Sequence, residues 1–515
     1  MTGAEIILKT AADAGVEICF ANPGTTELPL IAALDRVKSI RPVLGLFEGV
    51  CTGAADGYAR MKQKPALTLL HLGPGLANGI ANLHNAKRAQ SPMLNIIGQH
   101  ATWHINADPP LNMDIASLAR TVSDWCKQSE SVEALSRDTA EGLAASLYGQ
   151  ISTLIVPADH QWTEYKSDKI TLPEFTFDKV DQGVIANARE LLEKAKKPAL
   201  ILGGRALRKP GLTAAAEIQA KTGCDLLMIT FPAYFDSGEG LPILKRIPYF
   251  PGQAQTLLDN YDTLILAGAK EPVAFFGYPN GKSSLLNDQQ HPFRIDTGKQ
   301  DVAAILEELA WALDAVAGKI KPTLAKYTLP KLPSGKLNAE KICATIAALQ
   351  PEHCIVVDEG ISSTIPYYSY APFLKPYSQL NLTGGAIGQG MPLALGAALA
   401  YPDKKVINIE ADGSAMYTVQ ALWSQAREKV DVITVICSNR KYFIIELECM
   451  IAGYNSLGSE ARALMNLTNP VLNWVALSRG MGVPAASVTT AEELIREFEV
   501  ALKESGPHLI EAILE

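Results

Sequence analysis

Two short apolar runs near the C-terminus restrict the fold more than any other feature of the chain. The first, residues 406–409, leads into a polar turn that contains Asp412. The second, residues 432–438, is followed directly by Asn439, which lies 27 residues after Asp412. The segment between them, 416–429, is predicted to form a helix. Two strands joined through a helix lie parallel in one sheet, so the residues that follow them reach the same edge. The pattern predicts an α/β fold with Asp412 and Asn439 close together.

The rest of the chain repeats this alternation of strands and helices. A length of 515 residues exceeds what one hydrophobic core supports and predicts about three domains. We expect three doubly wound parallel-sheet domains at 1–165, 183–320 and 337–515, joined by polar, proline-bearing linkers at 164–181 and 319–336. Strands are expected at 17–20, 43–47, 66–70, 93–97 and 153–156, at 199–202, 225–229, 263–267 and 293–295, and at 353–357, 379–381, 405–409, 431–437 and 508–514.

Charge and composition exclude several classes of protein. A net charge of −8 argues against a nucleic-acid surface. The first residues lack a basic signal-peptide region, and the longest apolar stretch, 380–401, is interrupted by glycines and Pro392, so we expect no membrane span. The eight cysteines are scattered without a CxxC pair, which is typical of reduced thiols and gives no zinc site. A cytoplasmic enzyme is expected.

The polar turn after the first apolar run has the chemistry of a metal and phosphate site. Carboxylate and amide oxygens beside a Gly413-Ser414 turn that opens a helix can hold Mg²⁺ against a diphosphate. The pattern resembles the thiamine diphosphate motif, in which GDG is followed after a helix by NN. Two positions differ, because Ala411 and Ser438 replace the first residue of each element. By resemblance, Asp412, Asn439 and the backbone carbonyl of Lys441 are the metal ligands.

A glutamate in the first block of the chain, the expected domain 1–165, fits the same cofactor. An enzyme that uses thiamine diphosphate needs a carboxylate beside the aminopyrimidine ring. The hydrogen bond favours the imino tautomer, which removes the proton from C2. The family places this glutamate after a strand and nine residues before a GYAR tetrapeptide. Here Glu48 follows the predicted strand 43–47, and GYAR begins at Gly57, nine residues later. Glu48 is therefore expected to activate the cofactor.

Two further segments narrow the resemblance. NPGTTELP at 22–29 and LHLGPG at 70–75 are most similar to benzoylformate decarboxylase and acetolactate-synthase-like proteins, within the decarboxylase and acetohydroxyacid synthase branch. The resemblance implies pyrimidine-binding, central and diphosphate-binding domains, and a homodimer or homotetramer with each cofactor between two subunits. It also implies that His71 handles protons at the reacting carbon and that Thr25 contacts the substrate carboxylate.

Glycines and a serine of the third block, the expected domain 337–515, complete the expected cofactor site. The segment 383–390 reads TGGAIGQG, whose glycines let the backbone approach a flat ring. By resemblance, the Gly385 carbonyl accepts a hydrogen bond from the cofactor's 4′-amino group, and Ile387 is the wedge that holds the cofactor bent. The hydroxyl of Ser362, after another predicted strand, either binds the diphosphate or caps the next helix.

The chain also departs from these relatives. Phe275 and Phe276 stand where the benzoylformate decarboxylase pattern has a second active-site histidine, and Ile445 stands where pyruvate decarboxylases have a glutamate. His100 and His104, in a predicted loop at 99–106, are candidates to replace these groups. No segment resembles the FAD-binding part of acetohydroxyacid synthases. An apolar substrate pocket, with simple core packing as the alternative, is suggested by Phe275, Phe276, Ile444, Ile445 and Leu447.

These features favour a lyase that decarboxylates a 2-oxo acid without oxidation, through an enamine, and releases an aldehyde. A transferase is the first alternative, in which the enamine attacks a second carbonyl compound, as in acetolactate synthases but without FAD. The second alternative is a weakly active cofactor-binding paralogue that serves as a partner subunit. The sequence does not name the 2-oxo acid.

Overall fold

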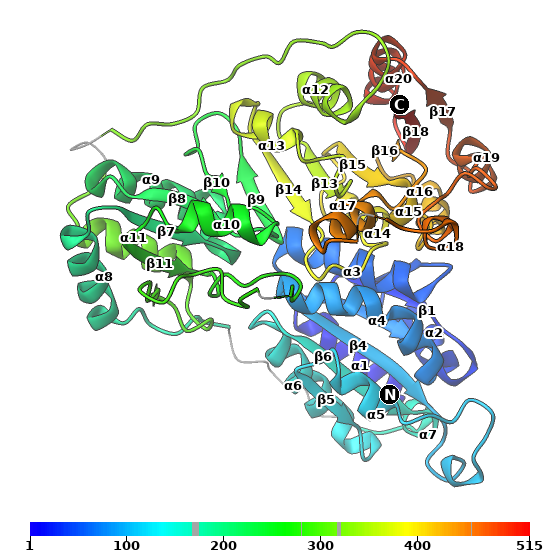
Figure 1. Ribbon diagram of the computed structural model, residues 1–515. Helices are drawn as coiled ribbons and strands as arrows, with labels where there is room; N and C mark the ends of the chain where they lie inside the picture. Colours follow the sequence, from blue (N-terminus) through cyan, green and yellow to red (C-terminus); the bar gives the residue numbers. More distant parts are fainter. Residues whose placement is uncertain (167–174, 280, 317–320, 455) are drawn as a thin grey trace.

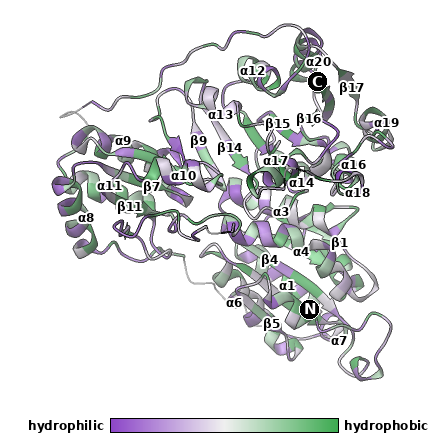
Figure 2. Ribbon diagram, viewed as in Figure 1, coloured by the Kyte–Doolittle hydropathy of each residue, from purple (hydrophilic) through white to green (hydrophobic). Residues whose placement is uncertain are grey.

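The chain folds around three β-sheets (Figure 1). The computed structural model describes residues 1–166, 175–279, 281–316, 321–454 and 456–515. The predicted α/β class with three mostly parallel sheets is confirmed. Parts of the two predicted linkers, 164–181 and 319–336, lie outside the described residues. Figure 2 shows hydrophobic residues gathered along the strands and on the helix faces that cover them, as burial of apolar surface requires.

The first sheet is entirely parallel, in the order β2-β1-β3-β4-β6-β5. One strand was not predicted: β5 is half-buried at the sheet edge and ends in Lys127 and Gln128, so it lacks a continuous apolar run. The strands are β1 Ile18–Asn22, β2 Arg41–Leu44, β3 Ala66–Leu70, β4 Met93–Gln99, β5 Trp125–Gln128 and β6 Ile151–Pro157. The helices are α1 Gly3–Asp13, α2 Leu28–Leu34, α3 Glu48–Lys62, α4 Leu72–Ala89, α5 Ile115–Arg120, α6 Leu135–Ser146 and α7 Ala158–Trp162.

The second sheet is smaller and also parallel, in the order β10-β8-β7-β11-β12. Its two edge strands are only two residues long, which leaves little unpaired backbone at the sheet edges. The strands are β7 Pro198–Leu202, β8 Asp225–Met228, β10 Lys245–Arg246, β11 Thr263–Ala267 and β12 Phe293–Arg294. The helices are α8 Gln182–Lys194, α9 Lys209–Thr222, α10 Pro251–Leu258 and α11 Val302–Ala312.

The third sheet has the order β17-β18-β16-β15-β13-β14-β9. The strands are β9 Tyr234–Ser237, β13 Ile355–Glu359, β14 Tyr377–Asn381, β15 Val406–Ala411, β16 Val432–Ser438, β17 Ala485–Val488 and β18 His508–Ile513. The helices are α12 Ala339–Leu349, α13 Tyr367–Tyr370, α14 Gly390–Ala400, α15 Asp412–Ala415, α16 Ala421–Glu428, α17 Phe443–Ile451, α18 Ser459–Ala463, α19 Trp474–Gly480 and α20 Ala491–Lys503.

Strand β9 departs from the predicted parallel arrangement. It belongs to the central segment of the chain, residues 183–320, yet it pairs antiparallel with β14 at the edge of the third sheet. Polar side chains join the two strands, because the Ser378 hydroxyl donates to Asp236 (2.8 Å) and lies 2.8 Å from the Tyr234 hydroxyl. A strand that reads YFDS carries no apolar alternation, which explains why the pattern missed it.

The helix predicted at 416–429 is shorter than expected. Residues 416–420 form turns, and α16 begins at Ala421. The buried Thr418 hydroxyl donates to the Gly388 carbonyl at 2.9 Å, so this segment supports the glycine-rich stretch 383–390 instead of continuing the helix.

Helix α3 of the first block lies directly against helix α14 of the third, and glycines make this possible. A Cβ on Gly57 would lie 2.2 Å from the carbonyl oxygen of Leu393, and one on Gly396 would lie 1.9 Å from that of Ala54. Both distances are shorter than any side chain tolerates. The first glycine is that of the GYAR tetrapeptide, so part of this motif serves helix packing.

The arginine of the tetrapeptide secures the same contact. Arg60 and Asp56 are both buried, and their two hydrogen bonds measure 2.8 and 2.5 Å. Arg60 also donates to the Asn381 carbonyl at 2.7 Å, and Gln389 donates to Asp56 at 2.6 Å. The buried ion pair of α3 therefore holds both ends of the segment between β14 and α14.

None of the helices in the described ranges is long and apolar enough to cross a membrane. All eight cysteines have free thiols, six of them buried.

We expect Gly396→Ala to destabilise the chain, because the new methyl group meets backbone that cannot rotate away. Overpacking of this kind costs about 1–3 kcal/mol of the free energy of unfolding. Thermal unfolding should show a lower Tm. Gly480→Ala is the control, since Gly480 ends helix α19 with open space around it and should not lower the Tm. An unchanged Tm for Gly396→Ala would contradict the proposed role of the contact.

Candidate functional site

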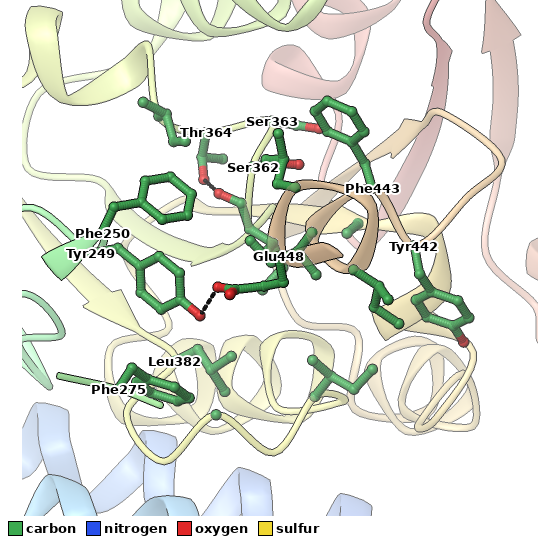
Figure 3. A pocket seen from close by; sticks show the side chains of 18 of the residues that line it. Tyr249, Phe250, Phe275, Ser362, Ser363, Thr364, Leu382, Tyr442, Phe443 and Glu448 are labelled. Atoms are coloured by element: carbon green, nitrogen blue, oxygen red, sulfur yellow. Dashed lines mark hydrogen bonds between the residues drawn. The ribbon is translucent and has the colours of Figure 1, made fainter. Parts of the chain in front are cut away.

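A cavity of about 850 Å³ opens at the C-terminal edge of the third sheet, where it meets the central segment. Ligand pockets commonly measure about 300–1,000 Å³. The residues that follow β13, β14, β15 and β16 line one side, and segments of the central part of the chain line the other. Figure 3 shows side chains from both sides pointing into this space.

Asp412 and Asn439 lie at neighbouring strand ends in this cavity, as the sequence predicted. Strands β15 and β16 are parallel partners, and their last paired residues are Ala411 and Cys437. Asp412 accepts hydrogen bonds from the backbone N–H groups of Gly413 (2.9 Å) and Arg440 (2.6 Å). The side-chain oxygen of Asn439 accepts one from the backbone of Lys441 at 3.0 Å. These bonds fix both side chains in place.

The electrostatics of Asp412 suit a cation. Burial raises its pKa to about 6, and the charge of Glu511 acts in the same direction. In the described part of the chain, no group of three His, Cys, Asp or Glu residues is arranged to hold a metal. A metal at this edge would instead take carboxylate, amide and carbonyl oxygens, which are the hard ligands that Mg²⁺ prefers. The donor set at Asp412, Asn439 and Lys441 therefore fits Mg²⁺.

Gly385 and Ile387 both line the cavity. Gly385 has φ +79°, and a Cβ there would lie 2.6 Å from the ring of Phe275 in the central segment. The left-handed backbone and the lack of space both require glycine at this position. The sequence analysis expected the backbone of 383–390 to approach a flat ring of the cofactor, and the ring that lies beside Gly385 in this structure is that of Phe275.

Helix α4 holds the glycine-rich stretch through residues that the sequence analysis missed. The Asn85 amide donates to the Ala386 carbonyl (2.7 Å), while its oxygen accepts from the backbone of Gly384 and Ala386 (3.1 and 3.2 Å). Asn82 donates to the Gly388 carbonyl at 3.2 Å, and His84 lies 3.1 Å from the Gly384 carbonyl. The available signal was the group of polar residues at 82, 84 and 85 within helix α4.

Glu359 also holds the glycine-rich stretch 383–390 in place. It is buried at the end of β13 and accepts hydrogen bonds from the backbone of Gly388 (2.7 Å) and Gly390. Burial raises its pKa to about 7. The backbone around Ile387 is thus fixed by α4 on one side and by a buried carboxyl group on the other.

The serines and the lysine of the expected site also line the cavity. Ser362 and Ser414 both reach it, together with Gly413 and Lys441. The hypothesis that Ser362 caps a helix is wrong, because residues 361–366 form turns and α13 begins after Pro366. The ammonium group of Lys441 forms an ion pair with Glu446 at 2.7 Å.

Glu48, His71 and Thr25 do not line this cavity. They gather at the C-terminal edge of the first sheet instead. Strand β2 ends at Leu44, earlier than predicted, and Glu48 is the first residue of α3, where it accepts a hydrogen bond from Asn78 at 3.0 Å. Gly75 lies between Glu48 and His71, since its Cβ would be 3.2 and 3.4 Å from their side chains. Thr25 is exposed nearby.

Glu27 is a residue of this second group that the sequence analysis missed. It is fully buried and lies 2.7 Å from Nδ1 of His71, and it accepts a hydrogen bond from the Thr26 hydroxyl at 2.5 Å. Because Nδ1 of His71 is engaged by Glu27, Nε2 is left for a ligand. The signal was the single acid within NPGTTELP, two residues after Thr25.

His100 lies close enough to His71 to feel its charge, and His104 lies next to His100. His100 follows β4, the strand next to β3, and its ring centroid is 5.7 Å from that of His104. Burial and the charges of His104 and His71 lower the pKa of His100. Its Nε2 atom is shielded from solvent and has no partner among the described residues.

The residues expected to form an apolar substrate pocket line this cavity, so core packing does not account for them. Helix α17 and the loop at 275–279 both line the cavity, and the ring centroids of Phe231 and Phe275 are 5.4 Å apart. The predicted residues that line it are Phe275, Phe276, Ile444, Ile445 and Leu447.

Comparisons with known proteins agree with this geometry. Residues 1–118 match the family "Thiamine pyrophosphate enzyme, N-terminal TPP binding domain", and residues 362–512 match the corresponding C-terminal TPP binding domain. The chain is 43% identical, over all of its length and 99% of the relative, to a Mycobacterium tuberculosis protein named "Putative acetolactate synthase large subunit IlvX". It is 28% identical to benzoylformate decarboxylase of Pseudomonas aeruginosa, over 96% of each chain.

Solved structures give the same result. The thiamine diphosphate-dependent 4-hydroxybenzoylformate decarboxylase of Rhodococcus jostii RHA1 superposes with a TM-score of 0.87 and 25% identity, covering 100% of this chain and 99% of that one. With both cofactor-binding domains matched and a full-length relative at 43% identity, the chain belongs to the family of thiamine pyrophosphate enzymes, whose cofactor is thiamine diphosphate.

Proposed function

We propose that this enzyme uses thiamine diphosphate and Mg²⁺ to decarboxylate a 2-oxo acid and release an aldehyde. The cavity is the observation that supports this most, because it combines oxygen ligands at one rim with an apolar wall at the other. A carboxylate that leaves water for an apolar wall loses favourable hydration. Loss of CO2 removes that charge, so the wall favours the decarboxylated product.

The third block would hold the cofactor. Asp412, Asn439 and the Lys441 carbonyl would bind Mg²⁺ and, through it, the diphosphate. The hydroxyls of Ser362 and Ser414, with the backbone of Gly413, would bind diphosphate oxygens. The Gly385 carbonyl would accept a hydrogen bond from the aminopyrimidine, and Ile387 would hold the two rings in a bent arrangement. When bound, thiamine diphosphate supplies a carbon nucleophile that adds to the 2-oxo group and accepts the electron pair left by CO2.

The first block of a partner subunit would complete each site. Within one chain, Glu48 and His71 lie outside the cavity that holds Asp412. A pair of chains that exchanges these edges would bring the partner subunit's Glu48 to the aminopyrimidine ring. His71, oriented by Glu27, would then present Nε2 to the reacting carbon and move a proton there. Thr25 would donate a hydrogen bond to the substrate carboxylate. A homodimer or a homotetramer satisfies this requirement.

Carboligation is the second candidate. It is favoured by the 43% identity to the protein named as an acetolactate synthase large subunit. In that reaction the same site would join the decarboxylated fragment to a second carbonyl compound, without FAD.

A panel of 2-oxo acids, incubated with thiamine diphosphate and Mg²⁺, tests the reaction. We expect release of CO2 and one aldehyde per acid consumed. With pyruvate, acetaldehyde would support decarboxylation, and acetolactate would support the transferase instead. If no acid on the panel releases CO2, both proposals fail and a role as a cofactor-binding partner subunit gains support.

Cofactor binding should depend on the metal. We expect thiamine diphosphate to raise the Tm when Mg²⁺ is present and to leave it unchanged after chelation, because ligands that bind the folded state stabilise it. Asp412→Asn should abolish the shift. Asp403→Asn is the matched control, since this exposed residue precedes the same strand at its opposite end. An equal shift after exhaustive chelation would disprove the metal assignment.

Mixing two inactive variants tests the shared site. Glu48→Gln and Asp412→Asn should each abolish CO2 release. A mixed dimer of the two has one site with both changes and one with neither. In an equal mixture of reassociated subunits about a quarter of the wild-type activity should return. If Glu48 and Asp412 served the same site of one chain, no mixture would contain an intact site and no activity would appear.

A further inference from the structure

One carboxylate on the α17 wall of the cavity is held by tyrosines from another part of the chain. Glu448 accepts a hydrogen bond from the Tyr249 hydroxyl at Oε1 and from the Tyr278 hydroxyl at Oε2, both 2.8 Å long (Figure 3 shows the bond to Tyr249). Both tyrosines belong to the central segment, and all three residues line the cavity. We call these three residues the Tyr–Glu–Tyr site.

The surroundings of the Tyr–Glu–Tyr site are aromatic. The rings of Phe231 and Phe275 lie 6.0 and 5.6 Å from that of Tyr249, and Phe276 lies 4.8 Å from Phe275. A flat, apolar ligand would fit against such rings, which prefer edge-to-face and offset contacts. Glu448 is therefore a carboxyl group within a largely aromatic part of the cavity wall.

No cation balances Glu448 within the described ranges. Lys441, a cation that lines the cavity, is paired with Glu446, and the guanidinium of Arg246 lies over the ring of Tyr368, 4.0 Å from its centroid. A partly buried charge without a positive partner is unfavourable, and a ligand that brings a donor would relieve it.

The site has unused capacity to accept hydrogen bonds. A carboxylate offers about four lone-pair positions, and the tyrosines use two of them. Desolvation and the charge of Glu448 raise the pKa of Tyr278 to about 12 and that of Tyr249 further, so both phenols remain protonated at neutral pH. Their hydrogens point to Glu448, which leaves their oxygens as additional acceptors.

We propose that the Tyr–Glu–Tyr site selects the far end of the substrate. It would take a 2-oxo acid with an aromatic body and a hydrogen-bond donor, a hydroxyl or an ammonium group, at the end opposite the reacting carbons. The inference rests on the proposed function, which places those carbons at the Asp412 side of the same cavity. A hydrogen bond to a charged group contributes enough to favour the donor-bearing acid by about 10- to 100-fold.

Binding of unreactive analogues tests the inference without turnover. In a 2-hydroxy acid the carbonyl that would be attacked is absent. We would measure the Kd of mandelate, 4-hydroxymandelate, 4-(aminomethyl)mandelate and 4-methoxymandelate on the enzyme loaded with thiamine diphosphate and Mg²⁺, by calorimetry. The methoxy compound matches the aminomethyl compound in size but has no hydrogen-bond donor at that end. We expect the hydroxyl or the aminomethyl compound to bind about 10- to 100-fold more tightly than the methoxy compound.

Variants separate selection from simple support of the helix. Glu448→Gln keeps the shape and a hydrogen bond to a tyrosine but removes the charge, so the preference should fall to near one. The matched control is Glu460→Gln in helix α18, an exposed residue that does not line the cavity, and this variant should keep the wild-type preference.

Equal affinities for all four analogues in the wild type, or no binding at all, would overturn the inference. So would a preference that survives Glu448→Gln. A loss of Tm with unchanged affinity ratios would show that Glu448 only ties α17 to the central segment. Failure of the proposed function appears differently, as the absence of CO2 from every 2-oxo acid, whatever the affinity ratios.

Discussion

The contact between helices α3 and α14 is the constraint on which the cofactor-binding half depends. Gly57 and Gly396 have no side chains, so the backbones of the two helices can come into contact. Arg60 then donates hydrogen bonds both to Asp56 and to the backbone at the end of β14. Removing one partner of a buried ion pair typically costs about 3–5 kcal/mol, so this bridge is hard to loosen. It sets the position of the backbone that lies between β14 and α14.

Helix α3 also carries a candidate site residue at its N-terminal end. It begins at Glu48, whose carboxylate we assign to the site of a partner subunit, while Arg60 supports the glycine-rich stretch of its own chain. One rigid helix would therefore connect two cofactor sites. Helix α4 repeats the arrangement, with His71 at its start and Asn85 holding the same stretch near its end. In the proposed pair of subunits, geometry at one site would in this way be coupled to geometry at the other.

The parts of the structure that sequence could predict are those set by local pattern. Strand, helix and strand in succession were enough to bring Asp412 and Asn439 together, since parallel strands end at a common edge. The pattern could not predict partners far apart in the chain. Strand β9 pairs with a sheet formed by a distant part of the chain. Glu27 can be identified as a site residue only because the fold places it beside His71. Tyr249 and Glu448, which form a hydrogen bond, are 199 residues apart in the sequence. Such contacts depend on packing, which periodicity does not encode.

Helix α17 buries none of its side chains within the chain, although most of them are apolar. Substitutions at such positions remove few packing contacts, so their effect on folding stability should be small. The wall that faces the ligand is thus separate from the cores that hold the sheets together. A scaffold of this kind can acquire new substrate preferences by mutation without first gaining a reserve of stability, and directed evolution of this enzyme would begin most productively at α17.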